Sequence, residues 1–163
     1  MRATYDDDSA RHELDLDPVP ALRTGGLFVL GHGAIDACAI FAMQTLASGD
    51  PHGARISGRA LGSIAVDLLL GYLLMARIES VRMWALLRGA VGVALVAVVS
   101  ETTDRLNGVP IGIPIGMACA FSVSLALVLV GTPGKVRLAF GWVLFAAYAI
   151  PTTTVLVAVF RAN

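Results

Sequence analysis

The sequence predicts an all-α integral membrane protein, a helical bundle of about five transmembrane helices behind an acidic N-terminal tail. The chain has 163 residues, of which 56% are hydrophobic and only 15% charged, and its mean hydropathy is +0.76. A soluble domain would carry about 25% charged residues. The apolar runs are continuous rather than alternating, which favours helices over a barrel, and helices satisfy their own backbone polar groups in lipid.

The N-terminal tail, residues 1–23, is expected to be disordered. Residues 1–20 contain six acidic residues and two arginines, a net charge of −4, whereas the rest of the chain carries +4. So acidic a segment contains too little apolar surface to form a core, and it does not suit nucleic acid binding. An arm that docks onto a basic partner surface is the alternative interpretation. The tail also lacks the pattern of a signal peptide.

Turn residues separate the apolar segments that follow. The first segment ends at residues 48–51 (Ser-Gly-Asp-Pro), and the second begins after Ser57 and Gly58. A polar link, residues 77–82, leads to the third segment, which ends at Ser100 and Glu101. The fourth segment begins near Pro110, because proline is tolerated in the first turn of a helix, and stops at residues 131–134 (Gly-Thr-Pro-Gly).

Each segment is about 20 residues long, which is the length that crosses a hydrocarbon core of about 30 Å. We therefore expect a bundle over residues 24–160, followed by a C-terminal end at 161–163. The expected spans are 25–47, 59–77, 82–100, 110–130 and 137–160. A bundle of four spans, with one segment lying flat or re-entrant, is the alternative.

Basic residues predict the orientation in the membrane. With five spans, eight Lys or Arg residues fall on the side of the N-terminus and four on the other side. The excess places the N-terminus in the cytoplasm. Arginine outnumbers lysine eleven to one, a bias typical of GC-rich bacterial genomes, so we expect a multi-pass protein of a bacterial inner (plasma) membrane.

Four ionisable residues lie inside the apolar segments: His32, Asp36, Asp67 and Arg88. His32 and Asp36 are four residues apart and share one helix face. At a rise of about 1.5 Å per residue, His32, Asp36 and Asp67 lie roughly 13, 19 and 15 Å from the cytoplasmic side. Arg88 lies roughly 9 Å deep, from where it can reach toward Asp67 or snorkel to the interface.

These residues have two interpretations. An ionisable side chain at the bilayer centre costs about 2.5–3.5 kcal/mol on insertion scales, so all four are expected to face the bundle interior and pair. One interpretation is a structural clamp, His32 with Asp36 or Asp67 with Arg88, that fixes helix register or docks a subunit. The other is a proton or ion relay, or an acid and base pair, because histidine exchanges protons near neutral pH.

Small residues recur every four positions along the fourth segment and form a smooth ridge. Such ridges let membrane helices approach closely. We expect this ridge to be a helix-packing surface, either within the chain or against another chain. Its members are Gly108, Gly112, Gly116, Ala120 and Ser124.

Patterns of known catalytic and metal sites are missing. There is no GxSxG, no HExxH and no phosphate-binding glycine loop. The chain has three histidines, of which His12 and His52 lie outside the apolar segments, and Cys38 and Cys119 have no metal-binding spacing. We therefore predict no catalytic residue, metal or cofactor, and we expect the protein not to be an enzyme.

Three functions remain. The first is an accessory or stabilising subunit of a larger inner-membrane complex, such as a multi-subunit, possibly lipid, transporter or a respiratory assembly. The second is a small oligomeric proton-linked transporter or channel that uses His32, Asp36 and Asp67. The third is a membrane-embedded enzyme acting on a lipid or isoprenoid. The expected partners are membrane lipids and either other integral membrane subunits or further copies of the chain.

Overall fold

The structure is a computed structural model that describes residues 18–48, 58–102 and 112–162. Within these ranges the chain forms five α-helices, and the all-α prediction is confirmed. The helices are α2 (Pro18–Ser48), α3 (Gly58–Met75), α4 (Arg82–Thr102), α5 (Gly112–Leu129) and α6 (Lys135–Ala162), with a short 3-10 turn, η1 (Glu79–Val81), before α4.

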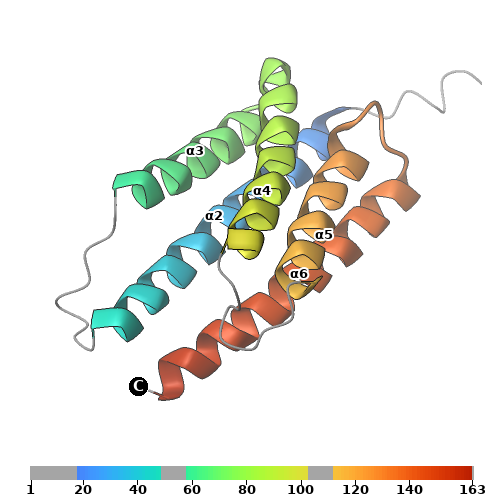
Figure 1. Cartoon of the computed structure of the whole chain (residues 1–163). Coiled ribbons are helices and arrows are strands. Elements are labelled where there is room, and N and C mark those ends of the chain that lie inside the picture. Colours follow the sequence, from blue (N-terminus) through green and yellow to red (C-terminus); the bar gives the residue numbers. More distant parts are fainter. Residues whose placement is uncertain (1–17, 49–57, 103–111, 163) are drawn as a thin grey trace, which may run out of the picture.

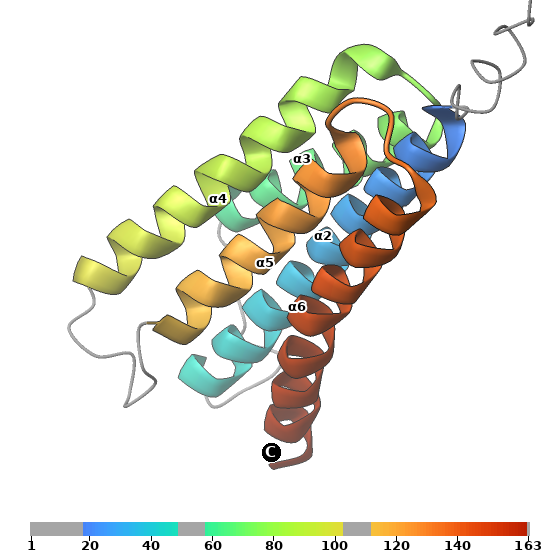
Figure 2. The same ribbon diagram turned by 90° about the vertical axis from the view of Figure 1, so that its right-hand side faces the viewer.

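Successive helices run in opposite directions, so the bundle is of the up-and-down type (Figures 1 and 2). Helix α2 packs against α3, α5 and α6, whereas α3 touches α4 only slightly. One end of the bundle carries the start of α2 and the turns α3–α4 and α5–α6. We call it the basic end, because it holds Arg23, Arg77, Arg82, Lys135 and Arg137. The other end is called the opposite end.

Four of the five described helices are long and apolar enough to span a membrane, which suggests a multi-pass membrane protein. Their candidate spans are Val19–Ala42, Glu79–Val98, Gly112–Leu129 and Lys135–Ala158. Helix α3 has only a shorter apolar stretch, Leu61–Met75. Large apolar side chains such as Leu69, Met83 and Val143 are more than half exposed, as expected of a bundle whose outer surface faces lipid.

The helix boundaries lie within two residues of the expected ones, with one exception. Helix α2 begins at Pro18 rather than at residue 25, so residues 18–23 belong to the helix and not to the tail. Proline fits a first turn because its missing N–H has no helical partner there, and Ala21 and Leu22 are buried. Residues 1–17 of the expected tail lie outside the described residues.

The turns at the basic end are fixed by backbone and arginine hydrogen bonds. Arg77 adopts the left-handed conformation (φ 66°), and its N–H donates to the Leu74 carbonyl at 3.0 Å while Ile78 N–H donates to Leu73 at 3.1 Å. These two bonds form a Schellman motif that ends α3. After α5, Arg82 donates to the Gly131 carbonyl at 3.1 Å, which connects the start of α4 to the turn between α5 and α6.

The densest packing lies in the half of the bundle near the basic end. Phe28 is fully buried, its ring stacks on Phe145 with centroids 4.4 Å apart, and it meets Trp142 edge-on at 4.8 Å. Leu22, Leu74, Leu125, Val128 and Leu129 surround this region and are also buried. This half of the bundle is therefore closed by large apolar side chains.

Candidate functional site: a buried charge cluster

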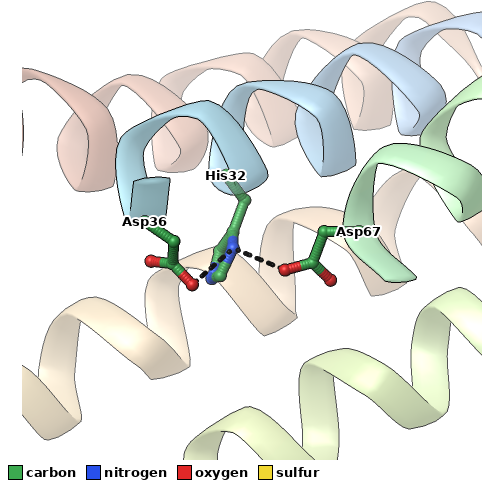
Figure 3. Close-up of side chains that lie close together, drawn as sticks. All are labelled: His32, Asp36 and Asp67. Atoms are coloured by element: carbon green, nitrogen blue, oxygen red, sulfur yellow. Dashed lines mark ion pairs between the residues drawn. The ribbon is translucent and has the colours of Figure 1, made fainter. Parts of the chain in front are cut away.

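Three ionisable side chains from α2 and α3 meet in the middle of the bundle (Figure 3). His32 Nδ1 lies 3.5 Å from Asp36 Oδ2, one turn further along α2, and 3.5 Å from Asp67 Oδ2 of α3. Gly33 makes this approach possible, because a Cβ atom there would lie 3.1 Å from the Cβ atom of Asp67. The small residue beside His32 thus lets α3 bring its carboxylate to the histidine.

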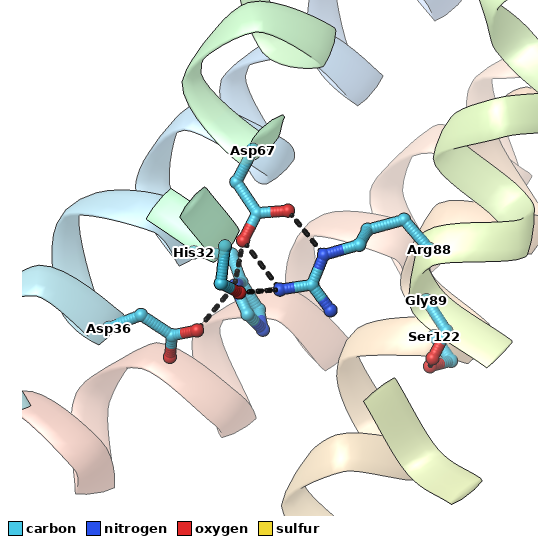
Figure 4. A network of polar contacts seen from close by, with 7 residues as sticks. His32, Asp36, Asp67, Arg88, Gly89 and Ser122 are labelled. Carbon is cyan, nitrogen blue, oxygen red and sulfur yellow. Dashed lines mark hydrogen bonds and ion pairs between the residues drawn. The ribbon is translucent and has the colours of Figure 1, made fainter. Parts of the chain in front are cut away.

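Arg88 of α4 completes the cluster from the other side (Figure 4). Its Nε lies 2.8 Å from Asp67 Oδ1, and its Nη2 donates to Asp67 Oδ2 at 2.9 Å. Nη2 also donates to the Ser63 hydroxyl oxygen at 2.7 Å. Of the two directions that the sequence left open for Arg88, the structure shows the inward one. The paired contact is the bidentate form of an arginine–carboxylate bond, which is the strong form.

A glycine also positions Arg88. Its neighbour Gly89 faces α5, where a Cβ atom would lie 3.3 Å from the Ser122 hydroxyl oxygen. That hydroxyl donates to the Gly89 carbonyl at 2.9 Å. The interface between α4 and α5 is therefore close at this level, and the preceding residue, Arg88, is directed toward α3 and α2.

Two aromatic side chains pack against the ring of His32. The imidazole lies against the Phe121 ring with centroids 4.1 Å apart, and it stacks on Tyr148 at 5.5 Å. Its Nδ1 is buried and makes no hydrogen bond within the described residues, although it lies 3.5 Å from an oxygen of each carboxylate. A buried nitrogen without a hydrogen bond is uncommon in folded proteins and calls for an explanation.

The charges of the cluster do not balance. Arg88 is fully engaged with Asp67, whose side chain is only 2% exposed. Asp36 is the second carboxylate, and its side chain is 34% exposed. With both carboxylates ionised and His32 neutral, the cluster carries one net negative charge, and one further positive charge makes it neutral. An unbalanced charge is costly in a low-dielectric interior.

The same three residues offer donor atoms to a cation. One ligand atom each from His32, Asp36 and Asp67 lies within 4.8 Å of the others. The sequence predicted no metal here. Both oxygens of Asp67 already bind Arg88, and a divalent ion would leave the cluster with one net positive charge. A monovalent cation, of which the proton is the smallest, therefore fits the charge of the site better.

A cavity of about 440 Å³ adjoins the cluster and extends toward the opposite end of the bundle. His32, Asp36, Ser63 and Arg88 form its polar side, and Tyr148 and Phe121 lie beside them. The remaining wall comes mainly from α4 and α5 and is mostly apolar, with Val93, Leu95, Val96, Pro114 and Met117 among its residues. Thr152 of α6 is its polar member, and its hydroxyl donates to the Tyr148 carbonyl at 2.7 Å. The volume is within the range of small-molecule sites, about 300–1,000 Å³.

One part of the small-residue ridge of α5 is buried in the structure and another part is exposed. Ser124 is fully buried and Ala120 packs against the core, so this part of the ridge lies inside the bundle. Gly112 and Gly116 are exposed, and a Cβ atom at either position would meet no atom of the described residues within 4 Å. Gly108 lies outside the described residues.

Sequence reasoning missed several residues of the site. Ser63, Phe121 and Tyr148 line the cavity, but a serine or an aromatic residue in an apolar helix is too common to be singled out. The close contact of α2 with α3 was also missed: a Cβ atom at Gly26 would lie 2.8 Å from the Gly71 carbonyl oxygen. The spacing of Ser63, Asp67 and Gly71, four residues apart, was the available indication.

No protein-family model, curated protein or solved structure matches this chain. The chemistry of the cluster and its cavity is therefore the basis for a function.

Proposed function

We propose that this protein is a small proton-linked transporter of the bacterial inner membrane, in which His32 carries the proton. One observation supports this most: His32 Nδ1 is buried, has no hydrogen bond within the described residues, and lies 3.5 Å from each of two carboxylates. A proton at Nδ1 would give that nitrogen a hydrogen to donate and would neutralise the cluster. A purely structural clamp does not explain why the buried Nδ1 of His32 has no hydrogen bond within the described residues.

Asp67 and Arg88 have a positioning role in this proposal. Their bidentate bond joins α3 to α4, two helices that otherwise touch only slightly. The bond holds one carboxylate at a fixed distance from His32. Asp36 is then the group that gains or loses an ionic partner when His32 changes its protonation.

The proposal includes five membrane crossings with a cytoplasmic N-terminus. Helix α3 has 18 residues and therefore a length of about 27 Å at 1.5 Å per residue, close to a hydrocarbon core of about 30 Å. It runs antiparallel to α2 (Figure 1). With the basic end in the cytoplasm, the cavity extends from the cluster toward the external side, and the aromatic packing around Phe28 closes the internal side.

A second candidate is an accessory subunit of a larger membrane complex, and the open half of the ridge favours it. Gly112 and Gly116 are exposed on α5 and have no neighbour within 4 Å of an added Cβ atom among the described residues, so the backbone of a helix from another chain can approach closely there. Leu95 and Val98 of the neighbouring α4 are also more than half exposed. The two candidates are compatible, because a transporter of five helices can need a partner or a second copy.

The test separates activity from stability. The whole chain is reconstituted in liposomes that contain a pH-sensitive dye, and the decay of an imposed pH gradient is followed alone and with sodium, choline or tetraphenylphosphonium on the other side. We expect a faster decay than in empty liposomes in at least one condition. His32→Gln and Asp67→Asn should abolish it at normal abundance, and Glu79→Gln, an exposed acid at the basic end, should not.

Two results would contradict the proposal. One is a decay no faster than in empty liposomes under every condition. The other is a loss of activity that always accompanies an equal loss of folded protein, which is the behaviour of a structural clamp.

A further inference from the structure

We propose that the cavity binds an amphiphilic organic cation, an apolar body that carries one positive charge, and that this cation competes with the proton of His32 for Asp36. The inference rests on the proposed function and names the substrate class of the same site. The feature behind it is a cavity of about 440 Å³ whose polar side has one carboxylate in excess and whose remaining wall is apolar.

Charge selects a cation over an anion. Arg88 lines the cavity, but its charge is already matched by Asp67 through two short contacts. Among the described residues, the close polar neighbours of the Asp36 carboxylate are His32, at 3.5 Å, and the Asp67 carboxylate, which has an oxygen within 4.8 Å; neither is a fixed positive charge. In Figure 4 Asp36 lies on the side of His32 away from Arg88. An anionic headgroup would raise the uncompensated negative charge, whereas one cationic group cancels it.

The walls select an apolar body. Val93, Val96 and Met117 provide aliphatic surface from two helices, and the aromatic rings of Phe121 and Tyr148 lie beside His32. An organic cation gains by contact with the faces of aromatic rings, and the gain increases when the cation is desolvated. A hydrated metal ion or a sugar would leave most of this wall without a partner.

The cavity also has a route of access. Leu95 belongs to its wall and is 56% exposed, so the cavity is open to the surroundings of the bundle at this residue. Pro114, in the first turn of α5, places the cavity near the opposite end. An amphiphile can therefore reach the site from the lipid or from the external side, while the buried residues around Phe28 separate it from the basic end.

The competition follows from the groups that face His32. These are Asp36 on its own helix, Asp67 on α3, Arg88 on α4 and Tyr148 on α6, and α5 presents the apolar Phe121. With both carboxylates ionised, these groups carry two negative charges and one positive charge, so one further positive charge neutralises them. When the organic cation pairs with Asp36, the proton on His32 leaves to water, and the reverse exchange restores it.

The test uses two probes of the same shape and opposite charge, tetraphenylphosphonium and tetraphenylborate, with the whole chain in lipid nanodiscs. We expect tetraphenylphosphonium to bind more tightly than tetraphenylborate. Its dissociation constant should rise by up to about tenfold for each unit by which pH is lowered, since one proton is displaced.

Variants locate the site. Asp36→Asn should weaken tetraphenylphosphonium binding by tenfold or more, Asp36→Glu should retain it, and His32→Gln should bind it with an affinity that does not change with pH. Glu79→Gln, which removes an exposed acid far from the cavity, is the matched control. A thermal melt of each variant verifies that it is folded.

Three results would overturn the inference: tighter binding of tetraphenylborate, unchanged binding by folded Asp36→Asn, or an affinity of the wild-type protein that is independent of pH. If the pH gradient of the liposomes still decays through His32 while tetraphenylphosphonium does not bind, the inference fails and the proposed function stands. If neither occurs, both fail.

Discussion

Arg88 and Asp67 form a bidentate ion pair between α4 and α3, with Nε 2.8 Å from Oδ1 and Nη2 2.9 Å from Oδ2. The pair is the main polar link between two helices that share little other contact, and it lies beside His32. Both its structural and its chemical importance can be tested by substitution.

The first prediction concerns this ion pair. Asp67→Leu alone or Arg88→Met alone should destabilise the bundle by about 3–5 kcal/mol, because each leaves one buried charge without its partner. The double variant Asp67→Leu/Arg88→Met should recover much of that loss. Thermal melts of the purified chains measure the effect, and Asp67→Asn should be tolerated better than Asp67→Leu because an amide still hydrogen-bonds. A double variant as unstable as the sum of the single variants would show that the two residues do not interact.

The second prediction concerns the contact between α2 and α3. In Gly71→Ala the new methyl group would lie 3.0 Å from the Gly26 carbonyl oxygen and 2.6 Å from Leu30 Cγ, so we expect a loss of about 1–3 kcal/mol from overpacking. Gly62→Ala on the same helix is the control, because a Cβ atom there meets nothing within 4 Å. Equal melting temperatures for the two variants would contradict the close approach of these helices.

More of the fold than of the candidate site could be predicted from the sequence. Five helices follow from apolar segments and turn residues, and both are local properties of the chain. The start of α2 at Pro18 could not be predicted, because it depends on the burial of Ala21 and Leu22 by other helices. Likewise, charges inside apolar segments identified His32, Asp36, Asp67 and Arg88, but the cavity beside them depends on how α4 and α5 are placed.

The third prediction concerns the exposed half of the ridge. Gly112→Leu and Gly116→Leu should leave the stability of the isolated chain unchanged, since neither position has a neighbour within 4 Å in the described structure. If another chain docks there, the same variants should reduce the amount of assembled complex. Mass determination after gentle solubilisation, compared with the melting temperature, separates the two effects. Assembly at wild-type levels in both variants would mean that this face contacts lipid.

The fourth prediction concerns membrane topology. In a chain that lacks Cys38 and Cys119, a membrane-impermeant thiol reagent applied from outside should modify His52→Cys or Asp104→Cys. It should not modify Ser80→Cys, which lies at the basic end in an exposed turn. Positions 52 and 104 lie outside the described residues. Each is in a segment that connects two helices at the opposite end of the bundle. Modification of position 80 alone would reverse the orientation.

The most direct test of the account is the protonation of His32 in the lipid-embedded protein. Nitrogen-15 NMR of labelled histidine, in a chain with His12→Gln and His52→Gln, reports on this one imidazole as the pH is changed. We predict that His32 gains and loses a proton reversibly in the folded protein and that Asp36→Asn alters the transition. A His32 that keeps one protonation state throughout, in a folded protein, would contradict the claim that the cluster carries a proton.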